Sequence, residues 1–146
     1  MIAFHLLHHG SAELQIVAKR LLKAHGIGEC VGVVDALGMC DAFASEIQLR
    51  FKPSKVLVEV PFTYLLENGQ TARGVIDLIL ETEAGWVVID HKTFLGSKAD
   101  WPARAASHSG QLSLYRDACR ASGCGDIAVW VHFVTGGGLV EVILPS

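Results

Sequence analysis

Two aspartates and a lysine stand inside the most hydrophobic stretches of this sequence. Asp77 interrupts the run GVIDLIL at residues 74–80, and Asp90 interrupts WVVIDHK at residues 86–92, where Lys92 follows two positions later. A valine or isoleucine would pack better at either aspartate position, because burial of a charged side chain carries a large desolvation cost. These three side chains are therefore the first candidates for chemistry.

Both runs predict β-strands, since they are rich in β-branched residues and bounded by turn residues. Side chains on a strand alternate between its faces, so Asp90 and Lys92 share one face and His91 points to the other. A predicted turn over residues 82–85 joins the two strands. Counting back from that turn places Asp77 near the level of Asp90, so we expect two carboxylates and an ammonium to converge.

Two interpretations of this arrangement stay open. The structural one is an ion pair between Lys92 and one of the aspartates at the end of a sheet. The functional one is a divalent-cation site, because two shielded carboxylates repel each other unless a cation neutralises them. Mg²⁺ typically binds one or two carboxylates together with water and substrate phosphate.

The elements that position these residues follow from changes in hydrophobic periodicity. Apolar residues recur at helical spacing in three segments, and runs of β-branched and aromatic residues alternate with turn residues elsewhere. Asn68-Gly69 is a strong hairpin signal between the first two strands. The predicted order is helix 11–25, helix 35–50, strands 56–66, 71–81 and 86–91, loop 94–106, helix 107–121, and strands 127–134 and 139–144. We therefore predict a single α/β domain over residues 1–146.

The composition limits the class of protein. Of the 146 residues 51% are hydrophobic, enough for a core without disulfides, and the net charge is −3. A slightly negative chain argues against a stand-alone nucleic-acid binder, whose affinity comes mainly from neutralising phosphates. No apolar run approaches the roughly 20 residues of a membrane span, and the first residues lack the features of a secretory signal. We therefore expect no membrane association and a cytoplasmic location.

Two further cofactor classes lack their sequence signatures. The chain has no GxxxxGK[ST] motif, so we expect no ATP site. The four cysteines form no CxxC pair, which argues against a zinc site and predicts free thiols. These cysteines are Cys30, Cys40, Cys119 and Cys124.

Several short motifs occur in a fixed order around the candidate residues. They are Glu59-Val-Pro61, Gly74-Val-Ile-Asp77, Asp90-His-Lys92-Thr93 and Gln111-x-x-x-Tyr115, preceded by His5. This ordered set resembles the PD-(D/E)xK nuclease superfamily, and more narrowly the RecB/AddA-type nuclease domain at the C-terminus of UvrD-like DNA helicases. The resemblance implies a restriction-endonuclease-like core, in which a mixed central sheet of three antiparallel strands, a helix crossover and further strands is flanked by helices.

The resemblance also implies a catalytic centre. Its catalytic residues would be Asp77, Asp90 and Lys92. Its metal ion, Mg²⁺ or Mn²⁺, would be held by the two aspartates, the backbone carbonyl of His91 and the N-terminal histidine His5, a position for which His8 competes. Some relatives carry a four-cysteine iron–sulfur cluster, but the spacing of cysteines after the catalytic strands is wrong here, so we expect none.

Other residues are expected to meet DNA. The resemblance gives Gln111, Tyr115 and Glu59 auxiliary or DNA-binding roles, and Arg116 adds positive charge where a phosphate backbone could run. Tyr115 has a structural alternative, in which its ring merely packs on the sheet. Trp101, in the predicted loop, is the tryptophan most available to stack on a base.

The sequence therefore predicts a metal-dependent deoxyribonuclease domain, with exonuclease favoured over endonuclease. We expect it to form part of a helicase–nuclease, or to partner one, in DNA recombination or repair. The alternatives are a catalytically inactive DNA-binding or scaffolding module of the same fold, and an unrelated α/β protein with a structural ion pair. Strand preference, polarity and the identity of the helicase do not follow from the sequence.

Overall fold

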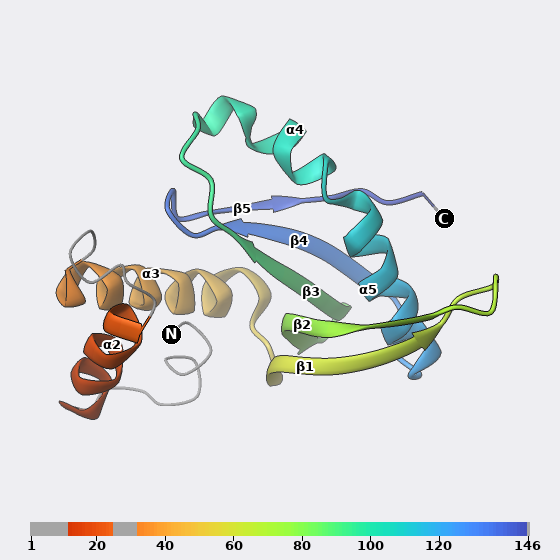
Figure 1. Cartoon of the computed structure of the whole chain (residues 1–146), viewed down its shortest axis with the longest axis horizontal. Helices are drawn as coiled ribbons and strands as arrows, with labels where there is room; N and C mark the ends of the chain where they lie inside the picture. Colours follow the sequence, from red (N-terminus) through yellow and green to blue (C-terminus); the bar gives the residue numbers. More distant parts are fainter. Residues whose placement is uncertain (1–11, 25–31, 146) are drawn as a thin grey trace. The chain divides into compact units, whose positions relative to one another are not determined.

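The computed structural model describes residues 12–24 and 32–145, which form the helices and strands drawn in colour in Figure 1. The chain divides into two compact units, Met1–Lys52 and Pro53–Ser146. The expectation of one domain over residues 1–146 stays a prediction. Among the described residues, no helix combines the length and the apolar character needed to cross a membrane.

The first unit contains two helices that pack against each other, α2 (Ala12–Ala24) and α3 (Val33–Phe51). Helix α3 ends at Lys52, whose backbone is left-handed with φ 45°, and Pro53 follows. A proline disfavours helical geometry at the residue before it, which explains the end of the helix there. The buried face of α3 repeats at helical spacing, as predicted, and consists of Ala36, Cys40, Phe43 and Ile47.

The second unit is built on a five-stranded mixed sheet. Its strands are β1 (Lys55–Leu65), β2 (Thr71–Thr82), β3 (Gly85–Lys92), β4 (Ile127–Phe133) and β5 (Gly138–Glu141), and they lie side by side in that order. The first three strands pair antiparallel, β3 and β4 pair parallel, and β5 returns antiparallel to β4. The expected α/β fold, a mixed sheet of the restriction-endonuclease-like kind flanked by helices, is confirmed.

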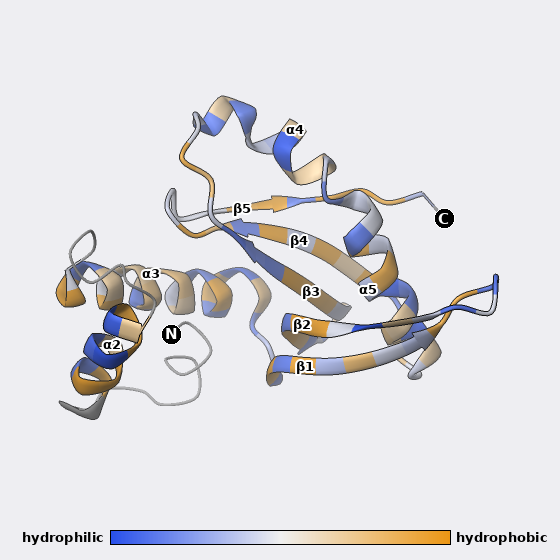
Figure 2. Ribbon diagram, in the orientation of Figure 1, coloured by the Kyte–Doolittle hydropathy of each residue, from blue (hydrophilic) through white to orange (hydrophobic). Residues whose placement is uncertain are grey.

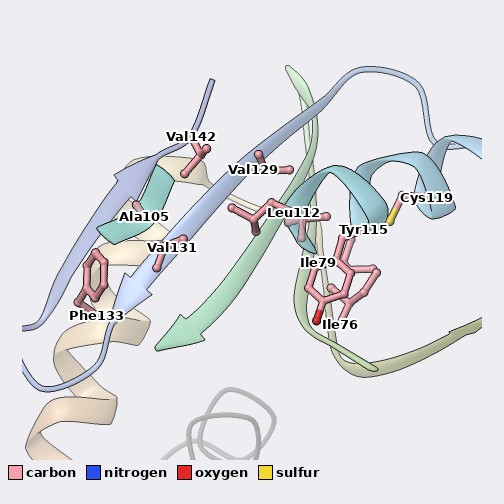
Figure 3. Close-up of a cluster of buried hydrophobic side chains, with 11 residues drawn as sticks. Ile76, Ile79, Ala105, Leu112, Tyr115, Cys119, Val129, Val131, Phe133 and Val142 are labelled. Carbon is pink, nitrogen blue, oxygen red and sulfur yellow. The ribbon is translucent and has the colours of Figure 1, made fainter. Parts of the chain in front are cut away.

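Helices α4 (Trp101–Ala106) and α5 (Ser109–Ala121) cover one face of this sheet. Figure 3 shows α5 turning its apolar side chains onto the strands, where Leu112, Tyr115 and Cys119 meet Ile79 and Val129 in one buried cluster. A helix between β3 and β4 is what parallel pairing requires, since the chain must return to the same end of the sheet.

One predicted segment is wrong. Residues 94–106 were expected to form a loop, but they contain a short 3₁₀ helix, Lys98–Asp100, and helix α4. The Ser97 side chain accepts the amide N–H of Ala99 at 3.2 Å, and Pro102 stands in the first turn of α4. A serine cap and an early proline are ordinary helix-start signals, which the loop assignment overlooked.

Candidate active site

The two aspartates stand where the sheet opens between β2 and β3. The pairing of these strands runs from the turn up to Leu78 and Ile89, so Asp77 and Asp90 come next in register on either side. Instead of continuing the ladder, Oδ2 of Asp77 accepts the backbone N–H of His91 at 2.8 Å. The carboxylate of Asp77 is therefore fixed between the diverging strands, beside the residue that follows Asp90.

Asp90 and Lys92 share the face of β3 that α4 and α5 cover. Asp90 is only 2% exposed, and Lys92 Nζ lies 2.7 Å from its Oδ2. The Lys92 ammonium is therefore the charged partner of this buried oxygen. Burial raises the pKa of Asp90, and the nearby Asp77 adds to that rise, while Lys92 opposes it. Figure 2 shows that the hydropathy of β3 changes along the strand, from hydrophobic residues to a hydrophilic C-terminal end.

Helix α5 holds Lys92 from the other side. Lys92 Nζ donates to Oε1 of Gln111 at 3.1 Å, and Nε2 of Gln111 donates to the hydroxyl of Tyr115 at 2.7 Å. That hydroxyl in turn lies 3.3 Å from the carbonyl oxygen of Val75 on β2. A chain of hydrogen bonds thus runs from the sheet through α5 to the lysine, and the i, i+4 spacing of its two helical members makes it possible.

Tyr115 also belongs to the core. Its ring is 6% exposed and meets Phe62 edge-on with the centroids 5.5 Å apart. Burial raises the pKa of the Tyr115 phenol, and the charges of Asp90 and Asp77 raise it further. The tyrosine therefore packs on the sheet and reaches the candidate site with its hydroxyl alone, while Gln111 is exposed beside Lys92.

A strained residue lies opposite Asp77. Glu59 on β1 has φ 50°, a conformation that costs a non-glycine residue about 1–2 kcal/mol. Its neighbours pair normally with β2, and the interruption falls at Glu59 and Asp77 themselves. Beyond it the alternation of β2 shifts by one residue, so Ile76 and Ile79 both enter the cluster under α5. The Glu59 side chain is exposed, and its auxiliary role stays a prediction.

His91 turns its ring to the opposite face of the sheet, where β4 carries His132 directly beside it. Their Nδ1 atoms are 3.0 Å apart, and His132 is 3% exposed. Burial lowers the pKa of His91 to about 4 and that of His132 to about 3, so both rings are neutral at neutral pH. The contact with His132 holds the ring of His91, while the backbone N–H of His91 binds Asp77.

The donor set fits a hard divalent cation. Two carboxylates and a backbone carbonyl are oxygen ligands of the kind that Mg²⁺ and Mn²⁺ prefer, and the Asp90 carboxylate is buried beside Asp77. Within residues 12–24 and 32–145, no three His, Cys, Asp or Glu side chains cluster as a metal site. A cation here would thus complete its shell with backbone, water or substrate oxygen.

Three other sequence candidates remain. His5, and His8 with it, fall outside the described residues. Arg116 is 8% exposed, and its guanidinium donates to Pro145 O at 2.6 Å and to Ser113 Oγ at 3.2 Å. Its side chain is therefore not brought to Asp77 and Asp90. Its contact with DNA stays a prediction.

The Trp101 ring packs against other residues of the protein. Its ring stacks on Phe133 with centroids 5.2 Å apart, and Lys98 Nζ lies 5.4 Å from its centre. A Cβ added at Gly136 or Gly138 would overlap the ring, so the turn before β5 closes over it. Little of the ring is therefore left for a base.

Two histidines near the site were not identified from the sequence. His132 owes its place to the parallel register of β3 and β4, which no local pattern encodes. His108 stands one helical turn before Gln111, and that spacing could have placed it near Lys92 once Gln111 was assigned.

Comparison with known proteins gives one family. The model of the PD-(D/E)XK nuclease superfamily matches residues 16–139. Two relatives are named as a subunit of an ATP-dependent helicase/nuclease. The one from Anoxybacillus flavithermus is 34% identical over 109 residues, covering 70% of this chain and 8% of the relative. The one from Geobacillus thermodenitrificans is 32% identical over 126 residues, covering 72% of this chain and 10% of the relative.

Among solved structures, one titled "Crystal structure of SSO0001" aligns with a TM-score of 0.46 and 15% identity. The alignment covers 99% of this chain and 74% of that chain. This similarity is too low to support a functional argument.

Proposed function

Because the chain belongs to the PD-(D/E)XK nuclease superfamily, we propose that it is a metal-dependent deoxyribonuclease domain that hydrolyses phosphodiester bonds. The observation that carries the proposal is the buried carboxylate of Asp90, whose Oδ2 lies 2.7 Å from Lys92 Nζ. Asp77 stands next to it, fixed by the N–H of His91.

Each residue has a definite task in this proposal. Asp77 and Asp90, with the carbonyl of His91, would hold Mg²⁺ or Mn²⁺, which supplies a Lewis acid for phosphodiester hydrolysis when bound. The Lys92 ammonium would neutralise charge that develops on the reacting phosphate. Gln111 keeps the ammonium oriented, so it is positioned before DNA arrives.

The partner is part of the proposal as well. The matched relatives are named as helicase/nuclease subunits, and this chain spans about a tenth or less of their length. We place the domain in the cytoplasm, in or beside a helicase that delivers DNA strands during recombination or repair. Such delivery favours an exonuclease, since a helicase feeds a strand end to the site.

The decisive experiment measures cleavage and metal binding together. Wild type should degrade linear DNA in Mn²⁺ or Mg²⁺ and spare circular single-stranded DNA, and Asp77→Asn should abolish both cleavage and the heat of Mn²⁺ binding in calorimetry. Lys92→Ala should keep Mn²⁺ binding and lose about 100-fold or more in kcat, as expected when one preorganised transition-state contact is removed. Glu81→Gln, a conservative change at an acidic position outside the candidate set, is the matched control and should leave both unchanged.

A second candidate is a catalytically inactive DNA-binding or scaffolding module of the same fold. The net charge of −3 favours the scaffolding form of this candidate, since it gives the chain little general attraction for DNA to bring substrate to the site. A protein that shifts DNA in a gel, shows no turnover and gives no heat with Mn²⁺ would establish this candidate and refute the nuclease.

A further inference from the structure

His108 occupies a fixed place at the start of α5, beside the candidate site. Its backbone N–H donates to Ala105 O at 3.0 Å, and its carbonyl accepts the N–H of Leu112 at 3.0 Å. It stands three residues before Gln111, which contacts Lys92. The backbone of His108 is therefore hydrogen-bonded on both sides, at the junction of α4 and α5. The His108 ring lies near enough to Lys92 for the ammonium to affect its pKa.

The imidazole has an unused polar atom in that position. Nε2 of His108 is buried and has no hydrogen-bond partner. The imidazole and the Asp90 carboxylate are close enough for each to affect the other's pKa, and Lys92 acts on both. A buried polar atom left without a hydrogen bond costs stability, so native proteins rarely keep one. An unpartnered nitrogen near the Lys92–Asp90 ion pair indicates a ligand that binds there.

The groups around His108 indicate the chemical class of the ligand. Burial lowers the pKa of His108, and the charge of Lys92 lowers it further, so the ring is neutral at neutral pH. A neutral imidazole carries one N–H, and a hydrogen on Nε2 needs an acceptor. Phosphate oxygens are acceptors only, and their negative charge suits the adjacent ammonium of Lys92.

We propose that His108 is a DNA-contacting residue whose Nε2–H donates to a non-bridging phosphate oxygen beside Lys92. The proposal deepens the nuclease function above and rests on it. The proposed contact gives Nε2 of His108 a hydrogen-bond acceptor. It also explains why a histidine stands at the start of α5, near Asp90 and Lys92.

Two substitutions separate hydrogen bonding from packing. His108→Leu removes the donor, and His108→Gln keeps an N–H donor at similar reach. Loss of a hydrogen bond to a charged group corresponds to about a 10-fold to 100-fold effect, so His108→Leu should lose that much in kcat/KM on linear DNA. It should lose a similar factor in affinity for a fluorescein-labelled oligonucleotide, measured by anisotropy in EDTA. His108→Gln should retain most of both.

Two further measurements exclude a structural explanation. Mn²⁺ affinity by calorimetry should be the same in wild type and His108→Leu. The Tm of DNA-free His108→Leu should equal or exceed that of wild type, because the substitution removes a buried unsatisfied nitrogen. Ser109→Ala, an exposed change in the same first turn of α5, is the matched control and should alter none of these values.

Each outcome bears on the proposal. Wild-type cleavage and affinity in His108→Leu would overturn it, as would a His108→Gln variant that fails as badly as His108→Leu. A fall in Tm that accompanies the loss and recovers with glutamine would also overturn it, since the ring would then be structural. If wild type cuts no DNA at all, the nuclease proposal fails, while the EDTA anisotropy still supports or refutes the phosphate contact on its own.

Discussion

Mild acid should destabilise the DNA-free protein through the buried pair His91 and His132. Their Nδ1 atoms lie 3.0 Å apart, and burial holds the pKa of the first at about 4 and of the second at about 3. An unfolded histidine titrates near pH 6.5. Between these values the unfolded chain binds protons that the folded protein does not, so stability is present at neutral pH and is lost as the pH falls through 6.5.

The size of the effect follows from the two pKa values. Going from pH 7.5 to pH 5.5, each histidine costs the folded state about 1.3 kcal/mol, because one pKa unit corresponds to about 1.36 kcal/mol. The pair should therefore lower the free energy of unfolding by nearly 3 kcal/mol, a large share of the stability of a small domain. Asp90 acts in the opposite sense, since burial raises its pKa and its protonation relieves a buried charge.

Urea unfolding in EDTA at fixed ionic strength, followed by tryptophan fluorescence from pH 7.5 to 5.5, measures this loss. His132→Leu should remove about half of the pH dependence, whatever it does to stability at pH 7.5. Ile89→Val is the matched control, because it lies on the same buried face, costs about 0.5–1.5 kcal/mol and carries no titrating group. Equal pH slopes in wild type and His132→Leu would refute the reasoning.

Three further predictions concern the site and its support. Asp90→Asn should leave the Tm in EDTA unchanged or higher while abolishing cleavage, because the ion pair with Lys92 offsets the burial of the Asp90 charge only in part; a large fall in Tm would contradict this. Gly138→Ala should cost about 1–3 kcal/mol in urea unfolding, since the new Cβ overlaps the Trp101 ring, whereas Gly110→Ala in α5 meets open space and should stabilise by up to about 1 kcal/mol. Tyr115→Phe should reduce kcat more than Mn²⁺ affinity, because its hydroxyl orients the Gln111 side chain that contacts Lys92, the lysine proposed to be catalytic; wild-type kcat would exclude this role.

Local chemistry in the sequence determined much of the fold. Strand alternation placed Asp90 and Lys92 on one face and His91 on the other, because successive side chains on any strand point oppositely. The Asn68-Gly69 turn set the first hairpin: the Asn68 side chain accepts the N–H of Gln70 at 2.9 Å, and Gly69 adopts φ 80°. Counting from a short turn is reliable over a few residues, which is why Asp77 was expected at the level of Asp90.

Helical periodicity was equally informative. The helix predicted over residues 107–121 is present as α5 and buries one face, because apolar residues three and four apart must lie on one side of any helix. The helical character of residues 98–106 was also encoded, by the Ser97 cap of the 3₁₀ helix and by Pro102 in the first turn of α4.

Only the tertiary structure decided how the site is completed. The contact of Gln111 with Lys92 and the meeting of His91 with His132 depend on how α5 docks and on the parallel register of β3 and β4. The strained backbone of Glu59 is likewise tolerated only because the paired strands fix it. Local sequence sets which face a residue can occupy, whereas partners distant along the chain are chosen by packing of the whole sheet and helix, and no single segment carries that information.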